Sequence, residues 1–192
     1  MIKKYDFRSG KWNQEDFFYS YSPRWNTRKV FIQEEDCISN NYDDGHLHYI
    51  SILTKKKYKT GVRLRTKCSF KSFGAPLIVF SDDVAPNEKG DMMYGLHFEA
   101  VAWFKGLNVW RVIALPERVE RPFHSTLTGS DSFTIGDDAV CEIDVTVREK
   151  EIYVGIDGHY ISIKEDALPE EFHVGITACE GINKFYEFSI EE

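Results

Sequence analysis

Residues 94–113 read Tyr-Gly-Leu-His-Phe-Glu-Ala-Val-Ala-Trp-Phe-Lys-Gly-Leu-Asn-Val-Trp-Arg-Val-Ile, two alternating runs that meet at Lys105 and Gly106. Successive side chains of a β-strand point to opposite faces. One face of the first run is therefore apolar, and the other carries His97, Glu99, Val101 and Trp103. In the second run Asn108, Trp110 and Val112 alternate with Leu107, Val109, Arg111 and Ile113. The stretch predicts a long β-hairpin with one apolar and one mixed face.

Further strand-like runs lie on both sides of this hairpin, separated by turn residues. They are residues 30–37, 46–53, 57–70 and 75–80 before it, and 139–148, 152–156, 160–163, 173–178 and 184–190 after it. Asp157 and Gly158, between two such runs, are a strong hairpin signal. No stretch shows sustained helical periodicity. We predict an all-β fold with little helix, a two-sheet antiparallel β-sandwich forming a single domain over residues 1–192. An aromatic-rich N-terminal arm, residues 1–29, is expected to pack on it.

The composition narrows the classes of function. The chain has 192 residues and a formal net charge of −7, which argues against a nucleic-acid partner because phosphate binding requires a basic surface. Its basic cluster, residues 55–67, is interpreted as a solvated strand edge. No window approaches a membrane span, so we expect no membrane partner. The first residues lack the apolar stretch of a signal peptide, which predicts a cytoplasmic protein.

The four cysteines, Cys37, Cys68, Cys141 and Cys179, are widely spaced. No pair has the short spacing that a zinc site uses. We therefore expect free, buried thiols. A chain of this length can bury about 70% of its unfolded surface, so it needs neither a disulfide nor a metal to fold.

The order of these runs resembles the concanavalin A-like lectin/glucanase superfamily, the jelly-roll sandwich of legume lectins, laminin G-like modules and several glycoside hydrolases. The resemblance is carried by residues 58–70 and 77–80, by the hairpin at residues 94–113, and by the closing runs Glu-Ile-Tyr-Val-Gly-Ile-Asp-Gly (151–158) and Phe-His-Val-Gly-Ile (172–176). It implies two curved sheets, with carbohydrate bound on the concave face or on rim loops. It implies no particular activity.

One branch of that superfamily, the laminarinases and lichenases, places three carboxylates along one strand so that they flank the glycosidic bond. Glu142 and Asp144 begin a similar pattern, but Thr146 and Val147 stand where the acid belongs. We interpret Glu142 and Asp144 as solvent-facing strand residues.

The mixed face of the central hairpin is the predicted ligand site. An indole can stack on the apolar face of a sugar while charged groups bind its hydroxyls. The candidates for stacking are Trp103, Trp110 and Trp25, and those for hydroxyl binding are His97, Glu99 and Arg111. In the alternative interpretation Trp103 covers the edge of the sandwich, and His97 and Glu99 are solvated.

Two other clusters are weaker candidates. His46 and His48 share a strand face beside Asp43 and Asp44, and we include both histidines among the ligand-binding residues. Their spacing also suits a metal, but polar surface is the favoured interpretation, so no metal is predicted there. Carboxylates also crowd the loop at residues 81–91, where solubilising charge is favoured and no cofactor is predicted. The alternative is a structural calcium ion held by Asp82, Asp83 and Asp91.

The sequence favours a carbohydrate-binding protein whose partner is a saccharide. One alternative is a divergent glycoside hydrolase or lyase in which Glu99 and His97 act as acid and base. Another is a protein-interaction or structural module that uses exposed aromatic residues of the arm. Which saccharide is bound, and the oligomeric state, are left open by the sequence.

Overall fold

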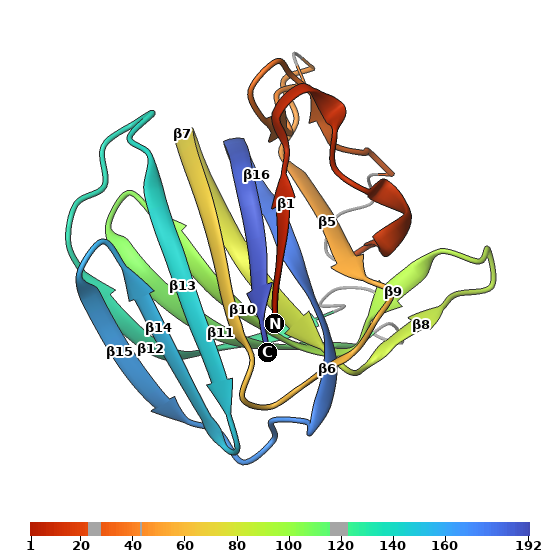
Figure 1. Ribbon diagram of the computed structural model, residues 1–192, viewed down its shortest axis with the longest axis vertical. Coiled ribbons are helices and arrows are strands. Elements are labelled where there is room, and N and C mark those ends of the chain that lie inside the picture. The colour runs from red at the N-terminus through yellow and green to blue at the C-terminus, as the bar shows by residue number, and fades with distance from the viewer. Residues whose placement is uncertain (23–27, 43, 116–122) are drawn as a thin grey trace.

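The computed structural model describes residues 1–22, 28–42, 44–115 and 123–192. Two packed layers of antiparallel strands form the molecule, as predicted (Figure 1). The first layer, sheet I, has the order β12 (Phe123–Ser132), β11 (Gly106–Ala114), β10 (Leu96–Trp103), β7 (Arg63–Ser81), β16 (Glu171–Glu191), β5 (His48–Thr54) and β2 (Phe17–Ser20). The second, sheet II, has the order β15 (His159–Lys164), β14 (Glu151–Ile156), β13 (Cys141–Arg148), β7, β16 and β1 (Ile2–Asp6).

Short elements complete the described part of the chain. The strands are β3 (Ile32–Gln33), β4 (Ile38–Ser39), β6 (Tyr58–Lys59), β8 (Val84–Pro86) and β9 (Met92–Tyr94), and 3₁₀ helices span Arg8–Gly10 and Gln14–Asp16. The β14–β15 turn at Asp157 and Gly158 has positive φ at both residues, 47° and 92°, as the hairpin signal predicts. No helix in the described ranges has the length and apolar character needed to cross a membrane.

Strands β7 and β16 belong to both sheets. They pair along their lengths, from His173 opposite Ser81 to Glu191 opposite Arg63. The C-terminal part of β7 pairs with β10 and its N-terminal part pairs with β13. The sequence predicts two separate strands where the structure has β7, at residues 57–70 and 75–80, and two where it has β16, at residues 173–178 and 184–190. The difference arises because the breaker residues at 72–74 and 180–181 bend the strands from one layer into the other.

Backbone geometry at this bend explains why it needs those residues. Ser72, Phe73 and Glu180 have φ of 55°, 65° and 62°, in the left-handed region. At Gly181 a Cβ atom would lie 2.0 Å from the carbonyl oxygen of Ser72. A glycine is therefore required where the two crossing strands come closest.

The core fills the space between the sheets. Phe80 and Phe98 of sheet I are stacked with ring centroids 5.3 Å apart, and both side chains are buried. Alternating residues of β13 and β14 face them from sheet II, namely Ile143, Val145, Val147, Ile152 and Val154. Each fully buried side chain of this size contributes about 1.5–3 kcal/mol. Period-two alternation thus fixes which face of each strand is left for solvent or ligand.

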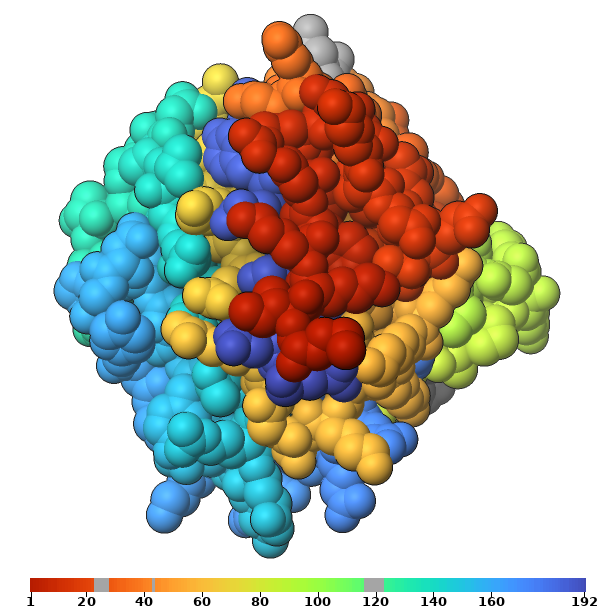
Figure 2. All heavy atoms as spheres, viewed as in Figure 1, coloured from red at the N-terminus to blue at the C-terminus, as the bar shows by residue number. Residues whose placement is uncertain are grey.

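The N-terminal arm does more than pack on the sandwich. Its β1 adds an edge to sheet II by pairing with β16, and its β2 adds an edge to sheet I by pairing with β5. Tyr5, Phe7, Trp12 and Phe17 are buried in the main core. Figure 2 shows the arm in red, lying over one side of the molecule. The two chain ends lie side by side, with the amino group of Met1 2.6 Å from the carbonyl oxygen of Glu192.

Candidate functional site

A cleft of about 430 Å³ lies on the face of sheet I that is turned away from sheet II. Strands β5, β7, β10, β11, β12 and β16 contribute side chains to it. Its floor is apolar, with Leu77 and Val101 packed among buried aromatic residues. Polar groups and two tryptophans surround that floor. An apolar cleft with a few convergent polar groups is the usual form of a small-molecule site.

The register of the central hairpin decides which side chains reach this cleft. Glu99 lies directly opposite Trp110, and Val101 lies opposite Asn108. Directly opposed residues of an antiparallel pair share a face. His97, Glu99, Trp103 and Trp110 accordingly line the cleft together. The structure therefore brings together four of the residues that the sequence nominates.

The Glu99 carboxylate lies at the centre of a hydrogen-bonded group. The Tyr49 hydroxyl donates to Oε1 of Glu99 at 2.6 Å, and Nε2 of His97 lies 3.2 Å from the same oxygen. The side chain of Glu99 is 12% exposed, whereas Tyr49 and His97 are buried. Burial and the neighbouring Glu99 charge raise the pKa of Tyr49 well above its usual value. Tyr49 therefore keeps its proton and remains a donor.

His97 is held between two strands in a defined tautomer. Its Nδ1 lies 3.2 Å from the carbonyl oxygen of Gly95, and the ring of Tyr94 stacks on it at 4.4 Å. A carbonyl oxygen only accepts hydrogen bonds, so Nδ1 carries the hydrogen. Nε2 of the same ring faces Oε1 of Glu99 at 3.2 Å. His97 and Glu99 are therefore neighbouring polar groups in the lining of the cleft.

The two tryptophans lie at the boundary of the cleft and are held there by different contacts. With its amide oxygen toward the indole, Asn108 accepts a hydrogen bond from Nε1 of Trp103 at 3.1 Å. The ring of Phe104 meets Trp103 edge-on at 5.0 Å, which fixes the indole plane. Trp110 is half-buried and packs against the apolar floor. Each indole thus has a fixed position and a partly exposed surface.

Arg111 lies outside this site. It is directly opposite Phe98, so it occupies the face that points into the sandwich. Its guanidinium NH1 lies 3.4 Å from the Glu165 carboxylate. The prediction that Arg111 joins Glu99 is wrong, because Trp110 is the residue opposite Glu99 and the side chain of the next residue, Arg111, points to the other face.

The predicted histidine pair also lies elsewhere. His48 is buried, with Nε2 2.9 Å from the Asp44 carboxylate and its ring edge-on to Tyr42. The hydrogen bond from His48 lowers the pKa of Asp44 below its usual value. His46 precedes β5 and is exposed. Neither histidine lines the cleft, so the structure does not bring them together with His97 and Glu99. Trp25, the remaining candidate, lies outside the described residues.

The acidic loop does not assemble the alternative calcium site. The Asp83 carboxylate accepts from the amide of Leu96 at 2.7 Å, and Asp91 forms an ion pair with Arg28 at 2.9 Å. Within the described ranges, three potential metal ligands converge only at Glu34, Asp36 and Cys37. Burial raises the pKa of Cys37 to about 12, which keeps its thiol protonated at neutral pH.

Sequence reasoning missed Tyr49, Asn108 and Glu180, which also line the cleft. The place of Asn108 in the cleft could have been predicted from the alternation of the strand, because Asn108 shares a face with Trp110. Tyr49 was not, because it reaches Glu99 only through the side-by-side order of β5, β16, β7 and β10. That order is a long-range property that no local pattern reports.

Comparison with known proteins concerns the fold. No protein-family model and no curated protein sequence matches this chain. Among solved structures, the carbohydrate-binding module CBM66 from Bacillus subtilis has a TM-score of 0.59 at 10% identity, covering 81% of this chain and 86% of that chain. The exoplasmic/lumenal domain of VIP36, in its Ca2+/Man-bound form, has a TM-score of 0.60 at 12% identity, covering 100% and 91%.

A third similar structure is the Bacteroides ovatus mixed linkage glucan PUL GH16 in complex with a G4G4G3G product. Its TM-score is 0.58 at 8% identity, and the match covers 98% of this chain and 99% of that chain. These identities are far too low to transfer an activity. They confirm that the fold is the concanavalin A-like jelly roll that the sequence resembles.

Proposed function

We propose that the protein binds a saccharide in the cleft of sheet I. The observation that carries the proposal is the placement of two tryptophans, Trp103 and Trp110, beside the hydrogen-bonded Glu99 group in one cleft. A pyranose has an apolar face and a rim of hydroxyls. Its apolar face would lie against an indole, and its hydroxyls would meet acceptors and donors of Glu99, His97 and Asn108.

The similar structures support this choice of ligand class. Their descriptions include a carbohydrate-binding module, a Ca2+/Man-bound domain and a GH16 protein with a glycan product. We infer only the class from them. Hydroxyl groups exchange water for protein partners at a net gain of about 0.5–1.5 kcal/mol each, so stacking supplies much of the affinity.

The test is a titration with a panel of neutral oligosaccharides, in which binding is measured by isothermal titration calorimetry and by tryptophan fluorescence. We compare the wild type with Trp110→Leu and Glu99→Gln, and use Val140→Ala as a control because Val140 is exposed and does not line the cleft. Each cleft variant should weaken binding about tenfold, equivalent to about 1.4 kcal/mol, and the control should bind normally. Equal binding by Trp110→Leu, or no binding of any probe, would contradict the proposal.

Hydrolysis is a second candidate because Glu180 lines the same cleft as Glu99. Glycosidases use two carboxyl groups about 5–9.5 Å apart. Oε1 of Glu99 already accepts a hydrogen bond from the Tyr49 hydroxyl, and an accepting oxygen in this position suits the binding of sugar hydroxyls. Product analysis separates the candidates. Products formed by the wild type, and lost in both Glu99→Gln and Glu180→Gln, would establish the hydrolase in place of the binder.

A further inference from the structure

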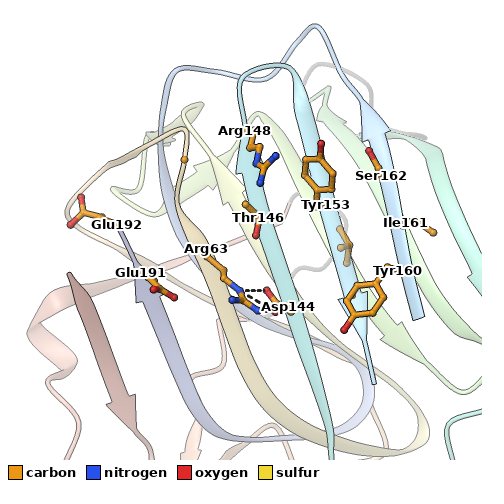
Figure 3. A pocket seen from close by; sticks show the side chains of 13 residues that line it. Arg63, Asp144, Thr146, Arg148, Tyr153, Tyr160, Ile161, Ser162, Glu191 and Glu192 are labelled. Carbon is orange, nitrogen blue, oxygen red and sulfur yellow. Dashed lines mark hydrogen bonds and ion pairs between the residues drawn. The ribbon is translucent and has the colours of Figure 1, made fainter. Parts of the chain in front are cut away.

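A second hollow, of about 650 Å³, lies on the outward face of sheet II. This face is visible in Figure 2, where β7 and β16 are seen between the red arm and the cyan and blue strands β13–β15. The hollow is a groove across the sheet, and its side chains come from five strands (Figure 3). At a strand spacing of about 4.8 Å, five strands span roughly 19 Å, enough for several sugar rings.

The register of sheet II sets two parallel rows across this groove. The first row runs Glu191, Arg63, Thr146, Tyr153 and Ser162. The second runs Ser189, Arg65, Asp144, Gly155 and Tyr160. Directly opposed residues share a face, so both rows point outward. The result is a surface with alternating charged groups, hydroxyls and rings.

Internal contacts hold the polar side chains of the groove in place. Arg63 forms a two-pronged ion pair with Asp144, with Nε 2.9 Å from Oδ1 (Figure 3). The hydroxyls of Tyr153 and Ser162 both donate to Glu151, at 2.5 and 2.6 Å. A bidentate arginine–carboxylate pair is rigid and still has free donor and acceptor positions.

One ring of the groove is placed by a glycine. A Cβ atom on Gly155 would lie 2.4 Å from Cε1 of Tyr160, its direct neighbour on β15. The absence of a side chain at residue 155 therefore lets the edge of the Tyr160 ring lean over the sheet. Tyr160 is nevertheless 73% exposed. An exposed tyrosine ring held above a sheet is an apolar platform next to polar groups.

The charges of the groove are balanced locally. Arg63 is paired with Asp144, Glu191 with Arg65, and Glu192 with Lys56. The guanidinium carbon of Arg148 lies 4.8 Å from the centre of the Tyr153 ring, and its charge is opposed by the nearby Glu151 carboxylate. The surface therefore presents both donors and acceptors but no excess of either charge. A neutral ligand rich in hydroxyls fits these groups better than a polyanion, which would need unpaired cations.

We propose that the groove between Arg63 and Tyr160 is a second saccharide-binding site, which takes a neutral oligosaccharide chain on the face opposite the cleft. The Tyr160 ring would stack on one sugar, and the Arg63–Asp144 pair would bind hydroxyls of a neighbouring sugar. This inference rests on the proposed function and extends it to a second surface. No residue of the groove lines the cleft, so the two sites can be tested separately. Such a site would hold a polymer at two places at once and raise its effective concentration.

The test maps each face separately by amide chemical shifts in nuclear magnetic resonance. The probes are cellotetraose, laminaritetraose and maltotetraose at millimolar concentration, with tetragalacturonate as an anionic probe. The protein is the wild type, Trp110→Leu, Tyr160→Ala and Tyr160→Phe. We expect a neutral probe to shift amides of β13–β15 in the wild type and in Trp110→Leu. Tyr160→Ala should weaken this response at least tenfold, and Tyr160→Phe should retain it because the ring face is unchanged.

Several further outcomes are decisive. Gly155→Ala should also weaken binding at sheet II, because it displaces the Tyr160 ring without removing it. Shifts confined to β10 and β11 would overturn the second site and leave the cleft proposal standing, whereas shifts confined to β13–β15 would do the reverse. A response to tetragalacturonate alone, or one unchanged in Tyr160→Ala, would also overturn the proposal for sheet II.

Discussion

Glu99 on β10 and Trp110 on β11 lie directly opposite each other, so a carboxylate and an indole are neighbours on one face of the hairpin. The distance between the Cβ atoms of such pairs is about 4.5–5.5 Å. A ring stacked on Trp110 would therefore bring its edge within reach of Glu99. The hydrogen bond from Tyr49 fixes the carboxylate from the other side. The cleft is thus arranged by strand pairing rather than by flexible loops.

Replacing Tyr49 with phenylalanine tests the stability of this arrangement. The Tyr49→Phe variant loses a buried hydrogen bond to a carboxylate, of a kind that contributes about 1.5–3 kcal/mol. We expect the free energy of unfolding to fall by about that amount in urea titrations at neutral pH. Tyr160→Phe, at an exposed ring, should change it by less than about 0.5 kcal/mol. Equal stability of Tyr49→Phe and the wild type would show that the hydroxyl contributes nothing.

Alkaline pH should destabilise the protein through its buried tyrosines. Burial raises the pKa of both Tyr49 and Tyr94 above the usual value of 10. Above pH 10 these tyrosines lose their protons in the unfolded chain but keep them in the folded chain. Their contribution to the free energy of unfolding is therefore complete below pH 10 and decreases as the pH rises above 10. Each tyrosine should add about 1.4 kcal/mol per pH unit to that slope. Urea titrations between pH 8 and 11 measure the free energy of unfolding as a function of pH. Above pH 10 this free energy should fall less steeply for Tyr49→Phe than for the wild type. An identical slope for the two proteins would contradict the prediction.

Alanine at Gly181 should strain the crossing of the shared strands. Its Cβ atom would meet the Ser72 carbonyl oxygen at 2.0 Å, so the backbone of β7 or β16 must shift. We expect a loss of roughly 2–4 kcal/mol in the free energy of unfolding, measured by urea titration. Gly136→Ala is the matched control, because no atom lies within 4 Å of a Cβ placed there. Equal effects of the two substitutions would show that the close approach at residue 181 is unimportant.

The four cysteines should differ in reactivity. Cys37, Cys68 and Cys141 are buried, whereas Cys179 is partly exposed and lines the cleft. The adjacent Cys141 and burial raise the pKa of Cys68 well above its usual value, so its reactive thiolate is scarce. We expect a disulfide reagent to modify Cys179 alone in the folded protein, and all four thiols in denaturant. A saccharide bound in the cleft should slow this reaction; fast modification of a folded Cys179→Ser variant would contradict the assignment.

The sequence predicted the parts of the fold that depend on local alternation. The central hairpin formed from β10 and β11, although Tyr94 belongs to β9 and not to its first strand. The turn at Asp157 and Gly158 formed as expected, and alternation correctly placed His97 and Glu99 on one face. It could not predict the bend at Gly181, because a glycine between two strand-like runs is equally typical of a turn. It also could not decide the place of Arg111. That depends on which residues of two strands face each other, and the packing of both sheets determines this pairing.

Strands β7 and β16 run from one layer into the other, and this continuity determines how the protein unfolds. Their ladder of hydrogen bonds is common to both sheets, so neither sheet can open without disrupting the other. The layers cannot melt in separate steps or slide past each other. Unfolding should be a single cooperative transition, and the amides of these two strands should be the last to exchange with deuterium. The two proposed saccharide surfaces, one on each sheet, would then be lost together.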